Sequence, residues 1–341
     1  MGHESSSRRE FLSSLAALGT AAMVPGGALL AQTRAQAVQG RIDVHHHLYP
    51  PFYVKEMGAT SNWTPAVSLE AMDSHNVATA LLSPVANLVG NSLSDKTERA
   101  RNLARRNNEY GAQLVRDYPG RFGLFAAVPL PDPEGSVREI AYAYDVLKTD
   151  GIGLWTSYID KWLGDPAFWP AYEELNRRNA VVFVHPSRNV CCSNLPGQSG
   201  ILDFDIDTAR AIDSLLWNGT TARFPNVRFI FVHSGGAVTV LAQRLMHDLP
   251  RNRERAKNFP NGVEHELTKL YFDVAHGTGR PALDALKALV PVSQILYGSD
   301  APVRAYPLTD ELFDQYAGFS TSDLKAINRS NSERLFARLK G

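Results

Sequence analysis

The chain has 341 residues, 44% of them hydrophobic, with 35 basic side chains against 35 acidic ones. This length allows a large hydrophobic core, and the balanced charge gives no electrostatic bias toward nucleic acid. We therefore expect an enzyme-sized protein that binds no nucleic acid. Its two cysteines, Cys191 and Cys192, are adjacent in sequence, and neighbouring cysteines form a disulfide only with strain, which argues against a disulfide framework.

The first 37 residues differ from the rest of the chain. The motif SRREFL at residues 7–12 precedes a weakly apolar stretch at 15–30 and then Ala35-Gln36-Ala37, a small-x-small cleavage signal. We interpret residues 1–37 as a twin-arginine signal peptide that directs the mature chain to the periplasm or the medium. Glycines and a proline interrupt the apolar stretch, so a membrane anchor is less favoured, and no stable membrane association is expected after cleavage.

Short apolar runs then alternate with longer helix-like segments. The predicted strands are Ile42–His46, Ala78–Leu82, Phe122–Val128, Gly151–Thr156, Val181–His185, Val227–Val232, Leu270–Asp273 and Gln294–Gly298. The predicted helices between them include Lys96–Asp117, Pro133–Lys148, Pro166–Arg178, Asp205–Asn218, Gly236–Leu249 and Pro281–Val290. Eight strand–helix units predict one α/β domain over residues 38–341, a (β/α)8 TIM barrel. The alternative, an open doubly wound sheet, lacks the glycine-rich phosphate turn expected after its first strand.

Three consecutive histidines end the first predicted strand. Successive side chains on a strand point to opposite faces, so His45 and His47 share one side while His46 turns away. Two imidazoles on one side of a strand end form half of a metal site. His46, on the other face, is expected to be a packing residue.

Further metal-binding groups end later strands. His185 ends the fifth strand, His233 follows the sixth and Asp300 follows the eighth. Because the carboxyl ends of barrel strands meet at one mouth, these side chains are expected to converge with the first-strand pair. The remaining histidines are interpreted as surface or structural residues, although the last of them follows the seventh strand and could reach the mouth: His75, His247, His265 and His276.

This arrangement resembles the amidohydrolase superfamily. The segments IDVHHHLYPPFYV, DGIGLWTSYIDKWLGDPAFWPAYEELNRR, VVFVHPS, FIFVHSGG and ILYGSDAP are similar to its decarboxylase branch, the aminocarboxymuconate-semialdehyde and resorcylate type, and most of all to 6-methylsalicylate decarboxylase-like proteins. The resemblance extends from Arg41 to about Leu339.

The resemblance implies that His45, His47, His185 and Asp300 hold one divalent ion, with water or substrate completing the shell. Zn²⁺ suits this imidazole and carboxylate set, and Mn²⁺ would also accept it. The end of the fourth strand offers no carboxylate or lysine to bridge a second ion, so the site is predicted to be mononuclear. No organic cofactor is required.

Two residues are candidates for proton transfer. His233 is interpreted as an acid or base beside the ion, because an imidazole exchanges protons near neutral pH; a fifth ligand or a hydrogen-bonding support is its alternative role. Asp300 is assigned both metal binding and proton delivery.

Three residues are candidates for substrate binding. In the decarboxylase family an arginine after the strand-six histidine reaches a neighbouring subunit's site, and Arg244 stands at the corresponding spacing, which implies a homodimer. Its alternative role is that of a solvated helix arginine. Arg188 is a candidate anion ligand or a surface residue, and Trp155 is a candidate for stacking on an aromatic substrate or for ordinary packing.

We therefore expect a nonoxidative decarboxylase of a phenolic or related unsaturated carboxylic acid. The same residues also fit metal-dependent hydrolysis of an ester, lactone or amide. A third reading is a non-catalytic periplasmic protein that binds a metal or an aromatic acid, which the proton-transfer groups argue against.

Overall fold

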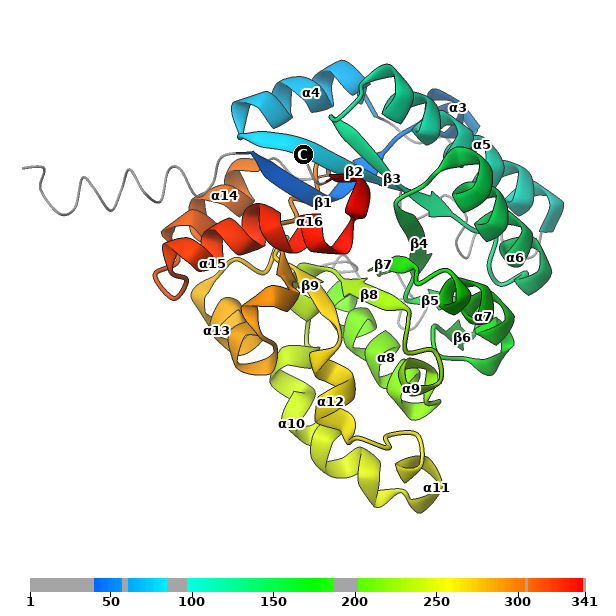
Figure 1. Ribbon diagram of the computed structural model, residues 1–341, viewed down its shortest axis with the longest axis vertical. Helices are drawn as coiled ribbons and strands as arrows, with labels where there is room; N and C mark the ends of the chain where they lie inside the picture. The colour runs from blue at the N-terminus through cyan, green and yellow to red at the C-terminus, as the bar shows by residue number, and fades with distance from the viewer. Residues whose placement is uncertain (1–39, 57–60, 85–96, 187–201, 304–305, 340–341) are drawn as a thin grey trace, which may run out of the picture.

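The computed structural model describes residues 40–56, 61–84, 97–186, 202–303 and 306–339. The interpreted signal peptide lies outside these residues, as do Arg188 and both cysteines. Within them, parallel strands occupy the middle of the molecule and helices surround them (Figure 1). This arrangement is the (β/α)8 barrel that the alternating pattern predicts.

The barrel has eight strands, and their order in the sheet follows their order in the chain. They are β1 (Arg41–Leu48), β2 (Val77–Pro84), β3 (Phe122–Ala127), β4 (Gly151–Trp155), β7 (Val181–His185), β8 (Arg228–Phe231), β9 (Tyr271–Asp273) and β10 (Ile295–Leu296). Every predicted strand overlaps one of them. A separate two-stranded antiparallel ribbon consists of β5 (Ser157–Tyr158) and β6 (Lys161–Trp162).

Backbone hydrogen bonds close the barrel just beyond β10. His47 N donates to Ala301 O at 2.6 Å, Asp300 N donates to His45 O at 2.8 Å, and His46 forms an isolated parallel bridge with Ala301. The first and last strands therefore meet beside the residues that the sequence assigns to the metal.

Helices connect successive strands and cover the outside of the barrel. The helices that match predicted ones are α5 (Thr97–Asp117), α6 (Pro133–Tyr142), α7 (Trp169–Arg177), α8 (Asp203–Trp217), α10 (Val238–Asp248) and α13 (Arg280–Leu289). Helices that match none of the predicted ones are α3 (Pro51–Glu56), α4 (Pro65–Ser74), α9 (Thr220–Arg223), α11 (Arg253–Ala256), α12 (Val263–Thr268), α14 (Tyr306–Gln315), α15 (Thr321–Lys325) and α16 (Asn331–Leu335).

The strands are buried on both faces, so their side chains form two core layers. One cluster fills the barrel interior and includes Val44, Phe125, Phe183 and Val232. The larger cluster fills the space between the strands and the surrounding helices. Parallel sheets covered on both faces produce the nearly continuous apolar strand sequences seen here.

The C-terminal segment closes one end of the barrel. Leu335, Phe336 and Leu339 belong to the interior cluster, where Phe336 lies edge-on to Phe125 at 5.8 Å between ring centroids. The histidines lie toward the carboxyl ends of the strands. Their site is therefore reached from the other end.

An irregularity in β1 determines which way its side chains point. Asp43 pairs with Ala80 and His46 pairs with Leu82, so three steps along β1 correspond to two along β2. Such a β-bulge changes the alternation of side chains. Val44 and His45 both contact the barrel interior, whereas Asp43 and His46 contact Tyr306 outside it.

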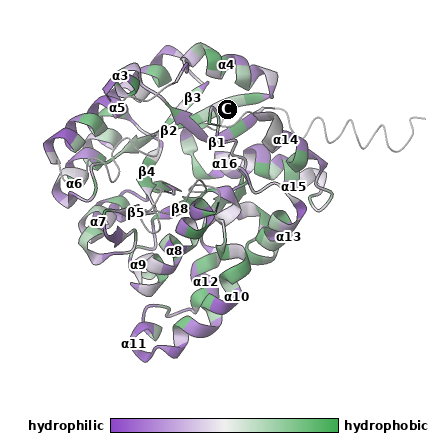
Figure 2. Ribbon diagram, turned by 180° about the vertical axis from the view of Figure 1, so that it is seen from behind, coloured by the Kyte–Doolittle hydropathy of each residue, from purple (hydrophilic) through white to green (hydrophobic). Residues whose placement is uncertain are grey.

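Polarity varies along the outer helices. In Figure 2, α11 at the far end of the α10–α12 extension is mostly hydrophilic, whereas α10 and α12 carry hydrophobic residues. Among the residues that the structure describes, no helix is both long enough and apolar enough to cross a membrane.

Candidate metal centre

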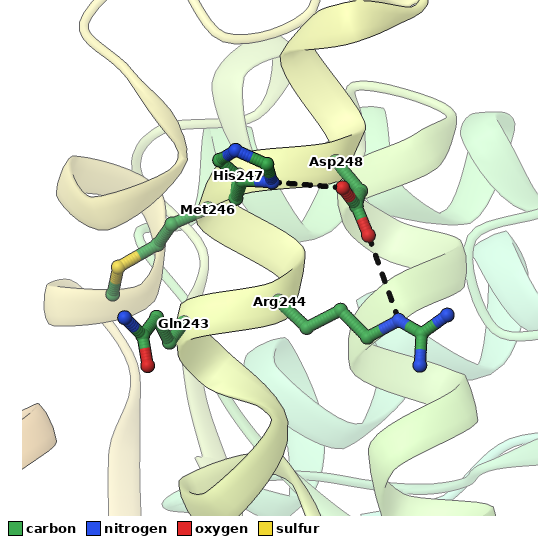
Figure 3. A pocket seen from close by; sticks show the side chains of 5 residues that line it. All are labelled: Gln243, Arg244, Met246, His247 and Asp248. Atoms are coloured by element: carbon green, nitrogen blue, oxygen red, sulfur yellow. Dashed lines mark hydrogen bonds and ion pairs between the residues drawn. The ribbon is translucent and has the colours of Figure 1, made fainter.

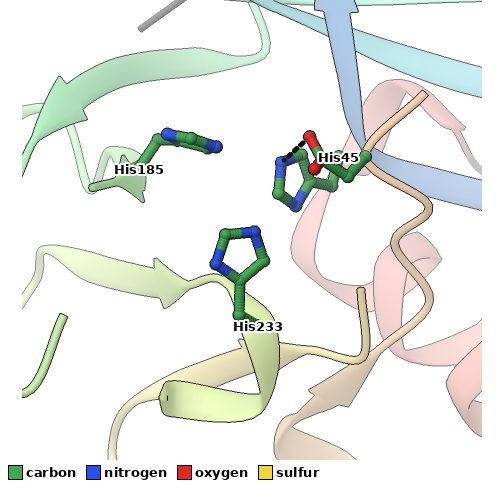
Figure 4. Close-up of side chains that lie close together, drawn as sticks. His45, His185 and His233 are labelled. Atoms are coloured by element: carbon green, nitrogen blue, oxygen red, sulfur yellow. Dashed lines mark ion pairs between the residues drawn. The ribbon is translucent and has the colours of Figure 1, made fainter. Parts of the chain in front are cut away.

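Four buried side chains converge at the carboxyl end of the barrel. They are His45 from β1, His185 from β7, His233 two residues after β8 and Asp300 four residues after β10, and one potential ligand atom from each lies within 4.8 Å of the others. Figure 4 shows the three imidazoles directed toward a common point. Residues far apart in sequence thus meet at one metal-binding position, as the strand-end pattern predicts.

Hydrogen bonds on the far side of two imidazoles direct their other nitrogens into the site. His45 Nδ1 lies 2.9 Å from Asp273 Oδ2, and His185 Nδ1 lies 3.0 Å from the carbonyl of Pro186. An imidazole that donates through Nδ1 presents the lone pair of Nε2 to a metal. Both rings therefore have the orientation that metal ligands need.

His47 adjoins the four-residue group. Its Nε2 lies 3.3 Å from His45 Nε2 and 2.8 Å from Asp300 Oδ1, while its Nδ1 lies 3.2 Å from Ser83 Oγ. His46 points the other way, as strand alternation predicts. The site thus offers His47 as well as His233 beside His45, His185 and Asp300.

One ligand atom in the site, His233 Nε2, is buried without a hydrogen-bond partner among the described residues, while Asp300 Oδ1 lies 3.1 and 2.8 Å from the Nε2 atoms of His45 and His47. Unpaired buried polar atoms are costly unless another group satisfies them. Imidazole nitrogens with one carboxylate oxygen suit Zn²⁺ and also accept Mn²⁺. The residues therefore fit a divalent ion that all of these atoms face.

The charges around His45 favour a positive charge in the site. Burial opposes protonation of this imidazole, but the negative charges of Asp273 and Asp300 outweigh it and raise its pKa to about 10. Burial and the neighbouring histidines hold the pKa values of His185 and His233 well below the usual range. These two rings are neutral at physiological pH, with lone pairs available for a metal.

Asp300 is held in its ionised form. Burial opposes its ionisation, but the charge of His45 and hydrogen bonds from His276, His45 and His47 hold its pKa well below the usual range. The two oxygens of this carboxylate face different partners. Oδ1 lies near the first-strand histidines, and Oδ2 lies 2.6 Å from His276 Nε2.

Three of the polar residues in the site have left-handed backbone conformations: His233 with φ 57°, His276 with φ 56° and Asp300 with φ 66°. Residues other than glycine rarely adopt such angles and do so mainly where the surrounding structure enforces them. Each turn lies two to four residues beyond the end of a strand and directs its side chain into the mouth. Gly298 permits the close approach of β10, because a Cβ there would lie 2.8 Å from Asp273 Cβ and 2.9 Å from His45 Cβ.

Two residues enter the site that the sequence reading did not assign to it. His276, interpreted as a surface or structural residue with the alternative that it could reach the mouth, does reach it: it contacts Asp300, and its ring centroid lies 4.8 Å from that of His233. Asp273 orients His45 with one oxygen and accepts hydrogen bonds from the backbone N–H groups of His233 and Ala275 with the other, at 3.1 and 3.0 Å. The signal for both was their position at or after the seventh strand.

The candidate substrate residues have different locations. Trp155 is buried at the end of β4, edge-on to His185 with 5.9 Å between ring centroids. The side chain of Arg244 on α10 is 80% exposed, and its Nε lies 3.5 Å from Asp248 Oδ2 (Figure 3). Arg244 therefore makes no contact with the metal centre within one chain. Arg188 lies outside the described residues.

The chain matches the family model described as Amidohydrolase over residues 42–338. It is 35% identical over 325 residues to the decarboxylase yanB of Aspergillus niger, covering 87% of this chain and 88% of that protein. It is 30% identical over 328 residues to 6-methylsalicylic acid decarboxylase of Penicillium expansum, covering 88% and 97% respectively.

The fold is similar to that of a solved dihydroxybenzoic acid decarboxylase from Polaromonas sp. JS666, which contains manganese and the inhibitor 2-nitroresorcinol. The two share 20% sequence identity with a TM-score of 0.75, and the match covers 89% of this chain and 98% of that one. The family match includes every strand that supplies the metal centre. The chain belongs to the amidohydrolase family, as its strand-end histidines and aspartate suggest.

Proposed function

We propose that the protein is a metal-dependent nonoxidative decarboxylase that acts on a phenolic or related unsaturated carboxylic acid, similar to 6-methylsalicylate. The observation that carries this proposal is the buried convergence of three imidazoles with Asp300 at the barrel mouth. Its support in the comparisons is that relatives at 35% and 30% identity, matched over most of their length, are named decarboxylases.

In this proposal one Zn²⁺ is held by His45, His47, His185 and Asp300, with His233 as an additional ligand or proton carrier. Mn²⁺ is the second candidate, supported by the manganese in the Polaromonas structure. A bound divalent ion supplies positive charge that orients a substrate carboxylate and an adjacent oxygen and stabilises negative charge.

Asp300 is proposed to carry a proton to the substrate carbon. As that carbon gains the proton, its bond to the carboxylate breaks and CO₂ leaves, so no oxidant or reductant is consumed. Because its low pKa keeps Asp300 ionised at rest, the proton has to arrive with the substrate or through His276. The His276 ring contacts Asp300 Oδ2, and its side chain is 25% exposed, so it connects the carboxylate with solvent.

The aromatic ring of Trp155 beside the metal centre supports an aromatic acid as substrate. Trp155, beside His185, is proposed to contact the substrate ring, and Arg188 is proposed to contact its carboxylate. The exposure of Arg244 leaves its guanidinium available to the site of a second copy. We propose a homodimer on this basis, to be tested by light scattering and by Arg244→Ala.

Export by the twin-arginine route is proposed from residues 1–37 alone. Replacement of Arg8 and Arg9 by lysine is expected to retain the protein in the cytoplasm. Fractionation of cells that express the full chain tests this, and normal export of the variant would contradict it.

The activity is tested with metal-replete protein and a panel of hydroxybenzoates and lactones, by following CO₂ and acid release together. We expect CO₂ without net uptake of water, and none from Asp300→Asn. Acid release with water added to the product would instead identify a hydrolase. Metal-dependent binding of a hydroxybenzoate without turnover of any compound would identify a binding protein.

A further inference from the structure

We propose that Asp43 is a positioning residue for the metal centre and that a buried chain of hydrogen bonds holds its carboxylate in place. The proposal rests on the metal centre of the proposed function, and it concerns the outer side of the same strand ends. Asp43 lies two residues before His45 and is fully buried. It does not face the ion position, so its effect on a metal is indirect.

The join between β10 and β1 is the part of the barrel where this carboxylate acts. Within the described part of the chain, this join has one isolated β-bridge, between His46 and Ala301, and three backbone hydrogen bonds: Val44 N to Tyr297 O, His47 N to Ala301 O and Asp300 N to His45 O. The bulge in β1 further reduces regular pairing near His45. His45 lies on β1 and Asp300 follows β10. The distance between these two residues therefore depends on the contacts that hold β1 and the segment after β10 together.

The carboxylate of Asp43 connects the two strand ends directly. Its Oδ1 accepts hydrogen bonds from His45 N on the first strand and from Ser299 N beyond the last, each at 3.0 Å. Its Oδ2 accepts from Ser299 Oγ at 2.6 Å and from Tyr306 OH at 3.0 Å. One side chain thus binds the backbone of one candidate ligand and the residue adjacent to Asp300.

A directional chain of hydrogen bonds leads to this carboxylate from the outer layer. Trp63 Nε1 donates to Ser68 Oγ at 2.7 Å, and Ser68 Oγ lies 2.7 Å from His46 Nε2. His46 Nδ1 lies 3.0 Å from Tyr306 OH, which donates to Asp43. Trp63 Nε1 can only donate, and a carboxylate can only accept. With the His46 proton assigned to Nδ1, each group before Asp43 in this series therefore donates to the next.

This series of hydrogen bonds gives His46 a role beyond packing, because it connects Ser68 with Tyr306. All five members are buried, and connected hydrogen bonds in a buried setting strengthen one another. Asp43 accepts four hydrogen bonds of 3.0 Å or shorter, two of them from backbone N–H groups, and His46 Nδ1 also lies 3.4 Å from Asp43 Oδ2. These hydrogen bonds to Asp43 therefore hold the two ligand-bearing strand ends in one geometry.

The test measures metal affinity without substrate. The dissociation constants of the metal-free protein for Zn²⁺ and Mn²⁺ are determined with a competing chromophoric chelator, alongside the melting temperature. Substitution of a residue that orients metal ligands costs about 10- to 100-fold in affinity, and we expect a loss of this size for Asp43→Ala. Asp43→Asn is expected to recover part of it, because an amide oxygen still accepts both backbone N–H groups.

Two further variants follow the chain away from the ion. Tyr306→Phe removes one donor to Asp43, and His46→Phe removes the link from Ser68 to Tyr306 together with a longer contact of 3.4 Å to Asp43 Oδ2. We expect each to lose less affinity than Asp43→Ala. These variants, together with Asp43→Asn, keep the test decisive if Asp43→Ala does not fold.

Asp150 provides the matched control, because its buried Oδ2 also accepts a backbone hydrogen bond, from Leu124 N at 2.9 Å, but at the beginning of β4. Asp150→Ala is expected to lower the melting temperature without changing metal affinity. Wild-type affinity in the folded Asp43 variants would overturn the proposal, as would an equal loss in Asp150→Ala. A wild-type protein that binds metal but releases no CO₂ would refute the proposed activity and leave this role intact; one that binds neither ion would refute both.

Discussion

Metal binding is expected to release a proton from His45. With the ion absent, the charges of Asp273 and Asp300 raise the pKa of His45 to about 10, so this imidazole is protonated at pH 7. A metal ligand has to be deprotonated, and a divalent ion therefore competes with that proton. His185 and His233, whose pKa values are well below the usual range, and the ionised Asp300 have no proton to lose there.

The size of the effect follows from the difference between the pH and this pKa. Removal of a proton at pH 7 from a group whose pKa is about 10 costs about 4 kcal/mol, since each unit corresponds to ~1.4 kcal/mol. Apparent affinity for Zn²⁺ should therefore rise about tenfold per pH unit above neutrality and level off near pH 10. The same raised pKa stabilises the metal-free fold below pH 6.5, and this stability is lost as the pH rises through about 10.

Calorimetric titrations of Zn²⁺ at pH 7 in buffers with different ionisation enthalpies measure the proton release directly. We expect about one proton per ion from the wild type. Asp273→Asn should release less, because loss of that carboxylate lowers the pKa of His45. Zero proton release by the wild type, or a Zn²⁺ affinity that is constant from pH 6.5 to 8.5, would refute the reasoning.

The remaining predictions concern individual residues of the site. Asp300→Asn should reduce CO₂ release by about 100-fold or more with an unchanged circular dichroism spectrum, and substantial turnover would show that another group delivers the proton. His45→Ala should remove most bound metal, measured by atomic emission; if His233 acts mainly in proton transfer, His233→Ala should retain most of it, and equal losses would make His233 a ligand. Gly298→Ala should lower the melting temperature and the metal content together, because its Cβ would lie 2.8 Å from Asp273 Cβ, and wild-type values for both would contradict that contact.

The sequence predicted the barrel because its strands are buried on both faces and therefore appear as continuous apolar runs. The ends of the helices and strands were predicted less accurately than their order. The predicted helix Pro133–Lys148 consists of α6 followed by a π-helical turn, Ala143–Leu147, and ends where Lys148 adopts a left-handed conformation. The last strand is only Ile295–Leu296. The residues after it form backbone hydrogen bonds with β1, but these do not have the regular spacing of a strand pair. These details depend on contacts between distant segments.

The same distinction applies to the site. His45, His185, His233 and Asp300 were predictable because each stands where an apolar run ends. Asp43 was not, since strict alternation would place it on the same face as His45, and only the bulge turns it outward. Asp273 and His276 likewise acquire their roles from partners on other strands.

The left-handed backbone conformations of His233, His276 and Asp300 serve the site at the expense of the stability of the fold. Glycine is the residue that such backbone angles favour, and strain of this kind costs about 1–3 kcal/mol at each position. A laboratory selection for heat resistance alone would therefore tend to replace these residues and erase the chemistry. Engineering of a hardier variant should leave all three unchanged and seek its gains on the outer helices.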